Sequence, residues 1–382
     1  MTEFMDLMDG WDGYSPLASV KLNEAAMARA VDLIFNRDRM PPHRHRYLLT
    51  EAITTADFPV LFGGVLDRQM LALYQAAPSP WRSYVPTGTL PDFRVATLHK
   101  VQGNQQILPR VREKEEYAIT PMVEASYNRQ LFKRGRKFDI SWEAIINDAF
   151  GAFDDIAQRF ANAAVYTEAT AASMVYTSAA GPNAALFGAP IADVDGQNVT
   201  NAGVLGLTIA NLETTMNLMA MQTDVQGRPL GIRGVHLVVP PALEWTARAI
   251  LSSAYKQHVD PAGAANAVAS AFIPLPTANV APQMGLQLHV DPLLPVIDGV
   301  APNTTWYLFA DQAQGKFGQV DFLRGHESPE ICMKASNKVT LTGGPIGPFE
   351  GDFDTDDILW RVRHCLGETQ LDPRYAYAQV GP

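Results

Sequence analysis

Cysteine is nearly absent from this chain of 382 residues, which holds only Cys332 and Cys365. Two cysteines cannot build the disulfide framework of a small secreted protein, and their spacing does not fit a zinc knuckle. The N-terminus lacks a basic region followed by an apolar stretch, and no run of 18 apolar residues is free of charges. The sequence therefore predicts neither a signal peptide nor a membrane span, and a reducing cytoplasm is the setting that we expect.

Positive charge is also scarce. The chain has 30 Lys and Arg against 40 Asp and Glu, which gives a formal net charge of −10, and only 18% of its residues are charged. General nucleic-acid-binding proteins neutralise phosphates with clustered Lys and Arg, so this balance argues against that class. The low charged fraction, beside 47% hydrophobic residues, favours a globular protein part of whose surface is covered by other subunits.

Sequence signatures of common enzymes are missing. There is no Gly-x-Ser-x-Gly elbow, no Gly-x-x-x-x-Gly-Lys phosphate loop and no Gly-x-Gly-x-x-Gly fingerprint. His326 and Glu327 lack the second histidine of a zinc protease helix. We therefore expect a protein that is not an enzyme, with no catalytic residues, no metal ligands and no cofactor.

Two clusters keep a metal-dependent hydrolase open as an alternative. His43 and His45 alternate with arginines after two prolines, and the turn from Asp352 to Asp357 resembles the start of a calcium loop. Alternate residues of one segment rarely converge on a metal without further ligands, and the calcium-loop pattern fails where the turn requires glycine. A basic turn at a subunit contact and a solvated acidic turn are the preferred interpretations.

The longest periodic segment runs from Phe138 to Thr177. Its apolar residues recur at the three-and-four spacing of an amphipathic helix, as in Phe153, Ile156, Phe160 and Ala164. Ser141 suits the cap of a first short helix, and the acidic residues after Asn147 suit a second helix N-terminus. We predict a short helix, a break near Asp148 and then a long helix of roughly 25 residues.

Before this helix, residues 93–139 alternate between polar and apolar side chains in two runs separated by a polar tip. This pattern predicts a long two-stranded arm, and because an isolated hairpin is marginally stable, the arm needs a surface such as another copy of the chain. The densest basic segment lies from Tyr127 to Phe138. We expect charged residues of the arm to meet a neighbouring subunit, namely Arg129, Lys133, Arg134, Arg136, Lys137, Arg110, Arg112, Glu115 and Glu116.

The other segments mix helices and strands without a strict period, which predicts an α+β fold. We expect helices over residues 22–35, 60–76, 208–221 and 241–255, and a loose loop over 258–281. Strands are expected at Gly234 to Val239 and over residues 285–290, 305–310, 320–323, 330–335 and 359–364, with residues 373–380 ending the chain.

Several of these segments resemble the major capsid proteins of tailed bacteriophages, in particular the Mu-like major head subunit group with the Hong Kong ninety-seven fold. The likeness covers residues 58–177 and 357–380. The most specific segment is FDISWEAIIND at residues 138–148, followed by FGAF at residues 150–153. It is accompanied by FPVLFG at residues 58–63 with Leu66 and Tyr74, by Trp81, by DFR at residues 92–94, and by RVRH at residues 361–364 with Gly367 and Asp372.

The resemblance implies a domain organisation. Residues 1–92 would form an N-terminal arm with helices, 93–138 an extended β-hairpin loop across the adjacent subunit, and 139–178 the spine helix of a peripheral domain. Residues 179–345 would build mainly an axial domain, and residues 346–382 would return as C-terminal strands to the peripheral and axial domains.

The resemblance also implies a function: self-assembly in hexamers and pentamers into an icosahedral shell that encloses the double-stranded DNA of a phage. Scaffolding, portal and cement proteins would be further partners. DNA would lie against the inner face without sequence-specific binding, and no membrane would take part. The protein would be found in the virion after assembly in the host bacterial cytoplasm. An encapsulin-like compartment shell and a phage tail or connector protein are the alternatives.

Overall fold

The computed structural model describes residues 70–102, 110–114, 116, 123–141, 151–193, 196–224, 227–258, 275–334, 353–355 and 357–382. The chain divides into two compact units. The smaller comprises Met1–Leu73, Gly135–Phe160 and Glu330–Arg363, and the larger comprises Tyr74–Arg134, Ala161–Pro329 and His364–Pro382. Each unit is described by itself below.

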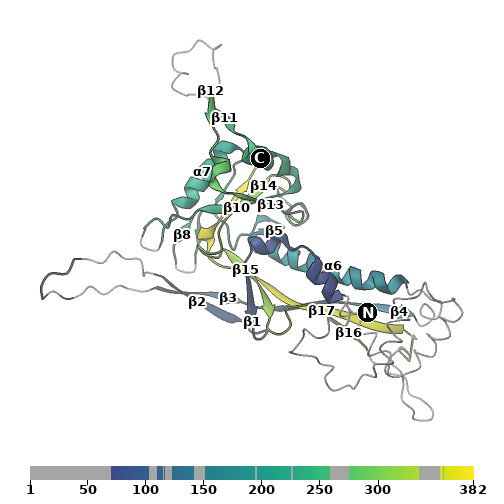
Figure 1. The fold of residues 1–382 in the computed structure, drawn as a ribbon. Helices are drawn as coiled ribbons and strands as arrows, with labels where there is room; N and C mark the ends of the chain where they lie inside the picture. Colours follow the sequence, from purple (N-terminus) through teal and green to yellow (C-terminus); the bar gives the residue numbers. More distant parts are fainter. Residues whose placement is uncertain are drawn as a thin grey trace, which may run out of the picture. The chain divides into compact units, whose positions relative to one another are not determined.

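A five-stranded sheet forms the centre of the larger unit (Figure 1). Its order is β13 (Gln287–Val290), β10 (Gly234–Val239), β14 (Thr305–Ala310), β18 (Ala376–Val380) and β9 (Ala202–Gly203). The central strand β14 runs antiparallel to its two neighbours β10 and β18, while β13 pairs parallel with β10 and β9 pairs parallel with β18 at the edges. Every residue of β14 is buried, because both faces of the sheet are covered.

One face of this sheet carries two helices, α7 (Ile209–Ala220) and α8 (Glu244–Ser252). Leu212 of α7 and Ile250 of α8 share an apolar cluster with Leu237 of β10 and Trp306 of β14. The hydroxyl of Thr208 accepts a hydrogen bond of 3.2 Å from the Asn211 backbone, which caps the first turn of α7. A 3-10 turn, η3 (Pro241–Leu243), leads into α8.

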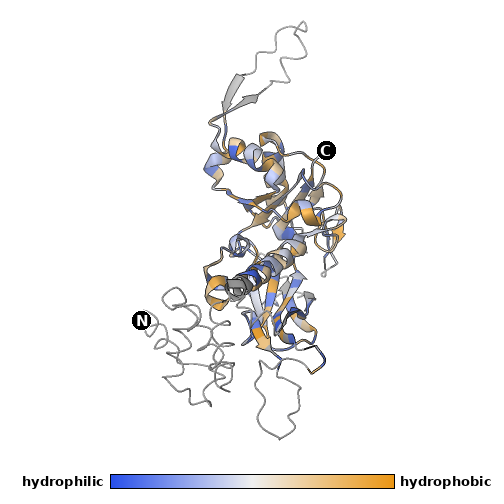
Figure 2. Cartoon of the chain, turned by 90° about the vertical axis from the view of Figure 1, so that its right-hand side faces the viewer, coloured by the Kyte–Doolittle hydropathy of each residue, from blue (hydrophilic) through white to orange (hydrophobic). Residues whose placement is uncertain are grey.

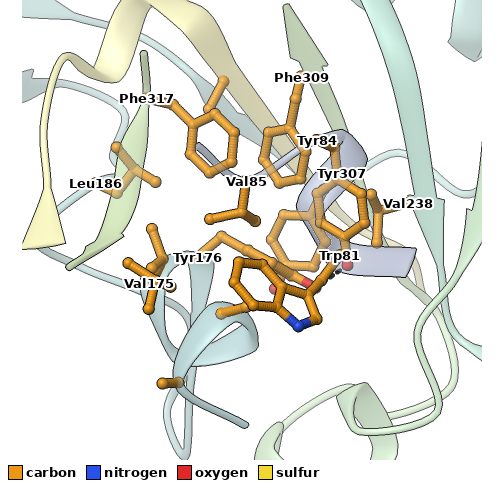
Figure 3. Close-up of a cluster of buried hydrophobic side chains, with 14 of the residues drawn as sticks. Trp81, Tyr84, Val85, Val175, Tyr176, Leu186, Val238, Tyr307, Phe309 and Phe317 are labelled. Atoms are coloured by element: carbon orange, nitrogen blue, oxygen red, sulfur yellow. Dashed lines mark hydrogen bonds between the residues drawn. The ribbon is translucent and has the colours of Figure 1, made fainter. Parts of the chain in front are cut away.

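The opposite face of the sheet packs against aromatic residues (Figure 3). Phe309 of β14 stacks on Phe317 with ring centroids 4.1 Å apart, and it also contacts Tyr84 and Tyr176. Tyr176 is the last residue of the long helix α6 (Gly151–Tyr176), and its hydroxyl donates a 2.5 Å hydrogen bond to Asp291. The end of α6 is therefore fixed to the sheet by both apolar contact and a buried hydrogen bond.

A second sheet has the order β1 (Thr87–Leu90), β15 (Gly318–Leu323), β17 (Asp357–Gln370) and β16 (Glu330–Met333), and β4 (Phe132–Ser141) also pairs with β17. In the larger unit, β15 lies parallel to β1 and antiparallel to the second half of β17. In the smaller unit, β16 pairs antiparallel with Trp360 to Arg363 of β17.

Two-stranded pairs complete the structure. They are β2 (Ala96–Gln102) with β3 (Val123–Arg129), β5 (Thr177–Ser178) with β6 (Gly181–Pro182), β7 (Ile191–Ala192) with β8 (Asn198–Val199), and β11 (Tyr255–His258) with β12 (Leu275–Ala278). Short helical turns are η2 (Pro80–Ser83), η5 (Ala281–Met284), α9 (Leu294–Ile297) and η7 (Pro373–Tyr375). Within the described residues, no helix has the length and apolar character needed to cross a membrane, and Figure 2 shows hydrophilic and hydrophobic residues interspersed along the elements.

Most predicted elements are present. The fold mixes helices and sheets as expected, α6 has 26 residues, and α7, β10 and β14 lie where their patterns place them. Residues 70–76 are helical, within the helix expected over residues 60–76. The helix over residues 22–35 and the break near Asp148 lie outside the described residues.

Three expectations need correction. The basic segment from Tyr127 to Phe138 is not one strand, because the chain leaves β3 after Arg129 and enters β4 at Phe132. The helix expected to reach Tyr255 ends at Ser252, where the side chain of Asn279 donates to the carbonyl groups of Ile250 and Ser253. Residues 275–278, expected in a loop, form β12 because they pair with β11.

Replacement of Phe309 by alanine should lower the free energy of unfolding by about 3–5 kcal/mol, because the fully buried ring would leave a cavity between three other aromatic rings. Urea denaturation of the free subunit measures this change. The control is Val204→Ala, since Val204 is 78% exposed and its removal should change stability by less than about 0.5 kcal/mol. Equal effects of the two substitutions would contradict the described core.

A pair of histidines joins β10 to the edge strand β13. The Nδ1 atom of His236 lies 3.0 Å from the Nε2 atom of His289, and the His289 ring lies 4.9 Å from that of Tyr84. Burial lowers the pKa of His236, although the charge of Asp311 opposes this effect. Burial, with the charge of His236, lowers the pKa of His289 to about 4. The folded state therefore favours neutral rings at this contact.

Acid should weaken the fold through this pair. Because the pKa of each ring is lower in the folded state than in the unfolded state, the stabilisation is complete above about pH 6.5 and is lost as the pH falls towards about 4. Denaturation of the free subunit between pH 7 and pH 4.5 tests this. His289→Gln should reduce the dependence on pH, whereas His99→Gln, at an exposed position, should leave it unchanged. An unchanged pH profile in His289→Gln would refute the assignment.

Candidate functional site

The hairpin of β2 and β3 has two different faces. The strands pair in register from Ala96 opposite Arg129 to Gln102 opposite Val123. Since side chains alternate between faces, Leu98 and Lys100 share one face with Tyr127 and Arg129. The other face carries the polar, exposed side chains of Thr97, His99, Ser126 and Asn128. Side chains of the first face form hydrogen bonds and ion pairs with other segments of the larger unit, whereas the named side chains of the second face are exposed to solvent.

A buried group of charges, which we call the anchor cluster, holds the first face. It consists of Lys100, Tyr127, Asp193, Asp372 and Arg374. The Tyr127 hydroxyl donates to Asp193 at 2.9 Å, and the Lys100 ammonium group donates to Asp372 and lies 3.5 Å from Asp193. Both strands of the hairpin thus reach the same pair of carboxylates.

Arg374 completes the anchor cluster from η7. Its Nη1 atom donates to Asp193 at 2.8 Å, its Nε atom donates to the carbonyl of Thr223 at 3.0 Å, and its side chain is 1% exposed. Asp372 caps the turn of η7 by accepting from the Arg374 backbone at 3.1 Å. Two carboxylates face two cations, so the buried charges balance.

The surroundings of Tyr127 favour a protonated hydroxyl that donates a hydrogen bond. Burial, followed by the charges of Asp372 and Asp193, raises the pKa of its hydroxyl far above the usual value of 10. The hydroxyl therefore stays protonated and donates to Asp193 throughout the range in which the subunit is folded. It acts as a structural hydrogen-bond donor and not as an acid or base.

A second contact fixes the end of β3. The guanidinium of Arg129 donates to the buried carboxylate of Asp321 through Nε at 3.0 Å and through Nη2 at 2.5 Å. Asp321 also accepts from Gln319 at 2.7 Å and from Thr369 at 3.3 Å. Gly88 of β1 has no room for a side chain beside this pair. The two-pronged geometry makes Arg129 part of the fold of its own subunit.

Another buried carboxylate, Glu168 of α6, accepts hydrogen bonds from Arg82 at 3.0 Å, from Tyr74, and from His364 at 2.9 Å if that nitrogen carries the proton. Burial raises its pKa, but the bonds from His364 and Tyr74 and the charges of His364 and Arg82 outweigh burial, so the pKa is lowered. Tyr74 and Arg82 also line an open hollow of about 810 Å³. Their bonds to Glu168 favour a structural role.

The structure places the predicted contact residues in two groups. Arg129 and Arg134 form ion pairs inside the chain, with Asp321 and with Glu368 at 2.9 Å, and their expected contact with a neighbour stays a prediction. The exposed group comprises Lys133, Arg136, Lys137, Arg110, Arg112 and Glu116. Glu115 lies outside the described residues. For the exposed group, contact with a neighbouring subunit stays a prediction.

The sequence did not reveal the anchor cluster. Asp193 lies in a segment rich in small and polar residues, and Lys100 lies in an alternating strand, so neither stands out. The Asp372-Pro373-Arg374 sequence is a signal for a capped turn. Nothing in it shows that the arginine is buried.

The described residues contain no group of three or more His, Cys, Asp or Glu side chains that could hold a metal ion. Of the residues in the hydrolase alternative, Asp354 is exposed. His43, His45, Asp352 and Asp356 lie outside the described residues.

The profile of a family described as phage capsid protein matches residues 125–379. No curated protein matches the chain. Among solved structures, the chain is similar to one from Gordonia phage Cozz, at 11% identity and a TM-score of 0.43, with 80% of this chain and 86% of the other covered. It is also similar to an encapsulin complex from Synechococcus elongatus, at 9% identity and a TM-score of 0.44, with 80% of this chain and 87% of the other covered. A virus-like particle from Pyrococcus furiosus is similar at 12% identity and a TM-score of 0.37, with 83% of this chain and 99% of the other covered.

Replacement of Asp193 by alanine should destabilise the free subunit by about 3–5 kcal/mol, because it leaves the buried Arg374 guanidinium without its closest carboxylate. Hydrogen exchange should also quicken at the amides that join β2 to β3. Denaturation and exchange measurements check the two effects. Asp354→Ala, at an exposed turn, is the control. A hairpin whose exchange is unchanged in Asp193→Ala would show that the anchor cluster does not hold it.

Proposed function

Because the chain belongs to the phage capsid protein family, we propose that its copies assemble into hexamers and pentamers of an icosahedral shell that encloses phage DNA. The chain is a major capsid protein, and its mixed helices and sheets are those of the Hong Kong ninety-seven type of capsid fold. The match to the family over residues 125–379 is the observation that carries the proposal, since it spans about two thirds of the chain. Its role in this proposal is structural and not enzymatic.

We propose that the hairpin is the segment that joins one subunit to the next. Its inner face is held by the anchor cluster, and its outer face carries the exposed polar side chains of Thr97, His99, Ser126 and Asn128. A rigid base allows the hairpin to bind a neighbour without first losing conformational freedom. The exposed cations Lys133, Arg136 and Lys137 would meet acidic surface of a neighbouring copy, which carries a net charge of −10.

The domain roles follow from the same proposal. Residues 1–92 would serve as the N-terminal arm, 93–138 as the extended loop and 139–178 as the spine. Residues 179–345 would supply mainly the axial domain, and residues 346–382 the returning strands. We also propose membership of the Mu-like major head subunit group, on the strength of the motif at residues 138–153.

The negative charge of the subunit suits a wall against which DNA lies without binding tightly, since 40 Asp and Glu outnumber the 30 Lys and Arg that could replace the counterions of phosphate. Assembly would take place in the cytoplasm of the host bacterium and would involve scaffolding, portal and cement proteins. The finished protein would belong to the virion.

Charge reversal at three exposed cations, Lys133→Glu, Arg136→Glu and Lys137→Glu together, should lower the yield of closed shells at least tenfold, because attraction between subunits becomes repulsion. Electron microscopy and sedimentation of the purified full-length protein measure the yield. Thermal unfolding of the free subunit should be nearly unchanged, because these side chains are exposed.

The matched control reverses three other exposed cations, Arg233, Lys316 and Arg324 of the larger unit, and so changes the net charge equally. Normal shells in the control and few in the test variant would support the proposal. Equal shell yields in both variants would contradict the role of the basic segment. Shells of the unaltered chain that contain a protein cargo instead of DNA would favour an encapsulin-like compartment.

A further inference from the structure

A strip of exposed apolar side chains runs along α8 and the chain that follows it. Trp245 is 81% exposed, Tyr255 is 69% exposed and Val280 is 47% exposed. We infer that this strip, the α8 strip, is a docking surface for a second copy of the chain. The inference rests on the proposed assembly and names one contact within it.

The bonds around Asn279 bring Tyr255 and Val280 to the end of α8. Its side chain donates to the carbonyls of Ile250 at 2.8 Å and Ser253 at 2.9 Å, and its backbone donates to Ala254 at 3.0 Å. Val280 follows Asn279 directly, and Tyr255 follows Ala254. Trp245 is seven residues before the end of α8, or about 10 Å along the helix axis. The α8 strip therefore fits within one ordinary interface.

The support beneath the α8 strip is rigid. Ala247 and Ile250, on the inner side of α8, are buried against the sheet. Of the exposed positions between Trp245 and the end of the helix, Ala249 and Ser252 carry small side chains, while Arg248 carries a long one that pairs with Glu244. The exposed ring of Trp245 therefore projects from a helix whose inner side is fixed to the sheet.

The composition of the strip is that of an interface centre. Trp and Tyr are enriched among residues that contribute most to protein binding, and each buries about 150–250 Å². The two rings with Val280 would supply roughly half of the 800 Å² that one partner contributes to a stable interface. Arg248 and Glu244, on the same helix as Trp245, form an ion pair at 2.8 Å, so together they carry no net charge. Two subunits of net charge −10 can approach there with little repulsion.

Other kinds of partner fit less well. Nucleic acid needs cations free to bind phosphate, whereas Arg248 is paired. A membrane-surface helix presents a wide apolar face flanked by basic residues, whereas α8 has nine residues and buries its inner side in the sheet. Every subunit carries the α8 strip, so its partner must be present in equal number. In a shell of identical chains, a second copy meets that requirement.

The test is Trp245→Asp in the full-length protein. The matched control is Thr246→Asp, which places the same charge at the next exposed position, also within the first turn of α8 where an acidic residue suits the helix. We expect Trp245→Asp to lower the shell yield at least tenfold while Thr246→Asp assembles normally. Thermal unfolding should show both free subunits folded, and Trp245→Ala replaces the aspartate variant if that one is unstable.

Hydrogen exchange gives an independent measurement. Amides of residues 244–256 should exchange at least tenfold more slowly in the shell than in the free subunit. Normal shells from Trp245→Asp, or unchanged exchange on assembly, would overturn the inference while leaving the proposed function intact. The inference would also be overturned if Trp245→Asp formed normal shells that lack a different protein, one that shells of the unaltered chain bind in equal number to the subunits. If the unaltered chain forms no shells, the proposed function fails. Sedimentation velocity then tests the inference by itself: self-association of the unaltered chain that is lost in Trp245→Asp supports it, and self-association that is unchanged overturns it.

Discussion

The buried guanidinium of Arg374 is the interaction on which the position of the hairpin depends. It brings together a turn near the C-terminus, the loop that holds Asp193 and, through the shared carboxylates, both strands of the hairpin. Lys100 and Asp372 are 272 residues apart in the sequence, so only the fold brings these segments together. A buried charge must be paired to be tolerated, so each partner of Arg374 is held at a defined place.

Charged anchors specify geometry more reliably than they add stability. A buried ion pair recovers little net free energy after desolvation, but any misplaced partner leaves a charge unpaired. The larger unit uses this device three times, with Arg374, with Asp321 and with Glu168. The aromatic cluster around Phe309 supplies apolar stabilisation, while the three charged groups fix the hairpin, β3 and α6 in relation to that core.

The sequence predicts elements where one local signal decides the outcome. The spacing of apolar residues defines α6 and α7, Thr208 defines where α7 begins, and the apolar run of β14 defines a strand covered on both faces. It fails where a distant residue decides. Asn279 ends α8 from 26 residues away or more, and pairing with β11 turns residues 275–278 into a strand. The anchor cluster escapes prediction for the same reason, since only the fold brings Asp193 to Arg374.

The charged and apolar side chains of the larger unit fall into two groups, those that hold the fold together and those that are exposed to other molecules. Cations that the fold needs are buried with carboxylates of the same chain, as Arg129 and Arg374 are. The described surface offers other molecules, among other features, exposed polar side chains of the hairpin, exposed cations and the apolar α8 strip. Exposed contacts of these kinds are individually weak, because solvent screens the charges and each apolar area is small. Repetition over many identical copies is what makes weak contacts sufficient, so a subunit with a rigid interior and modest contacts can form a stable shell without tight pairwise binding.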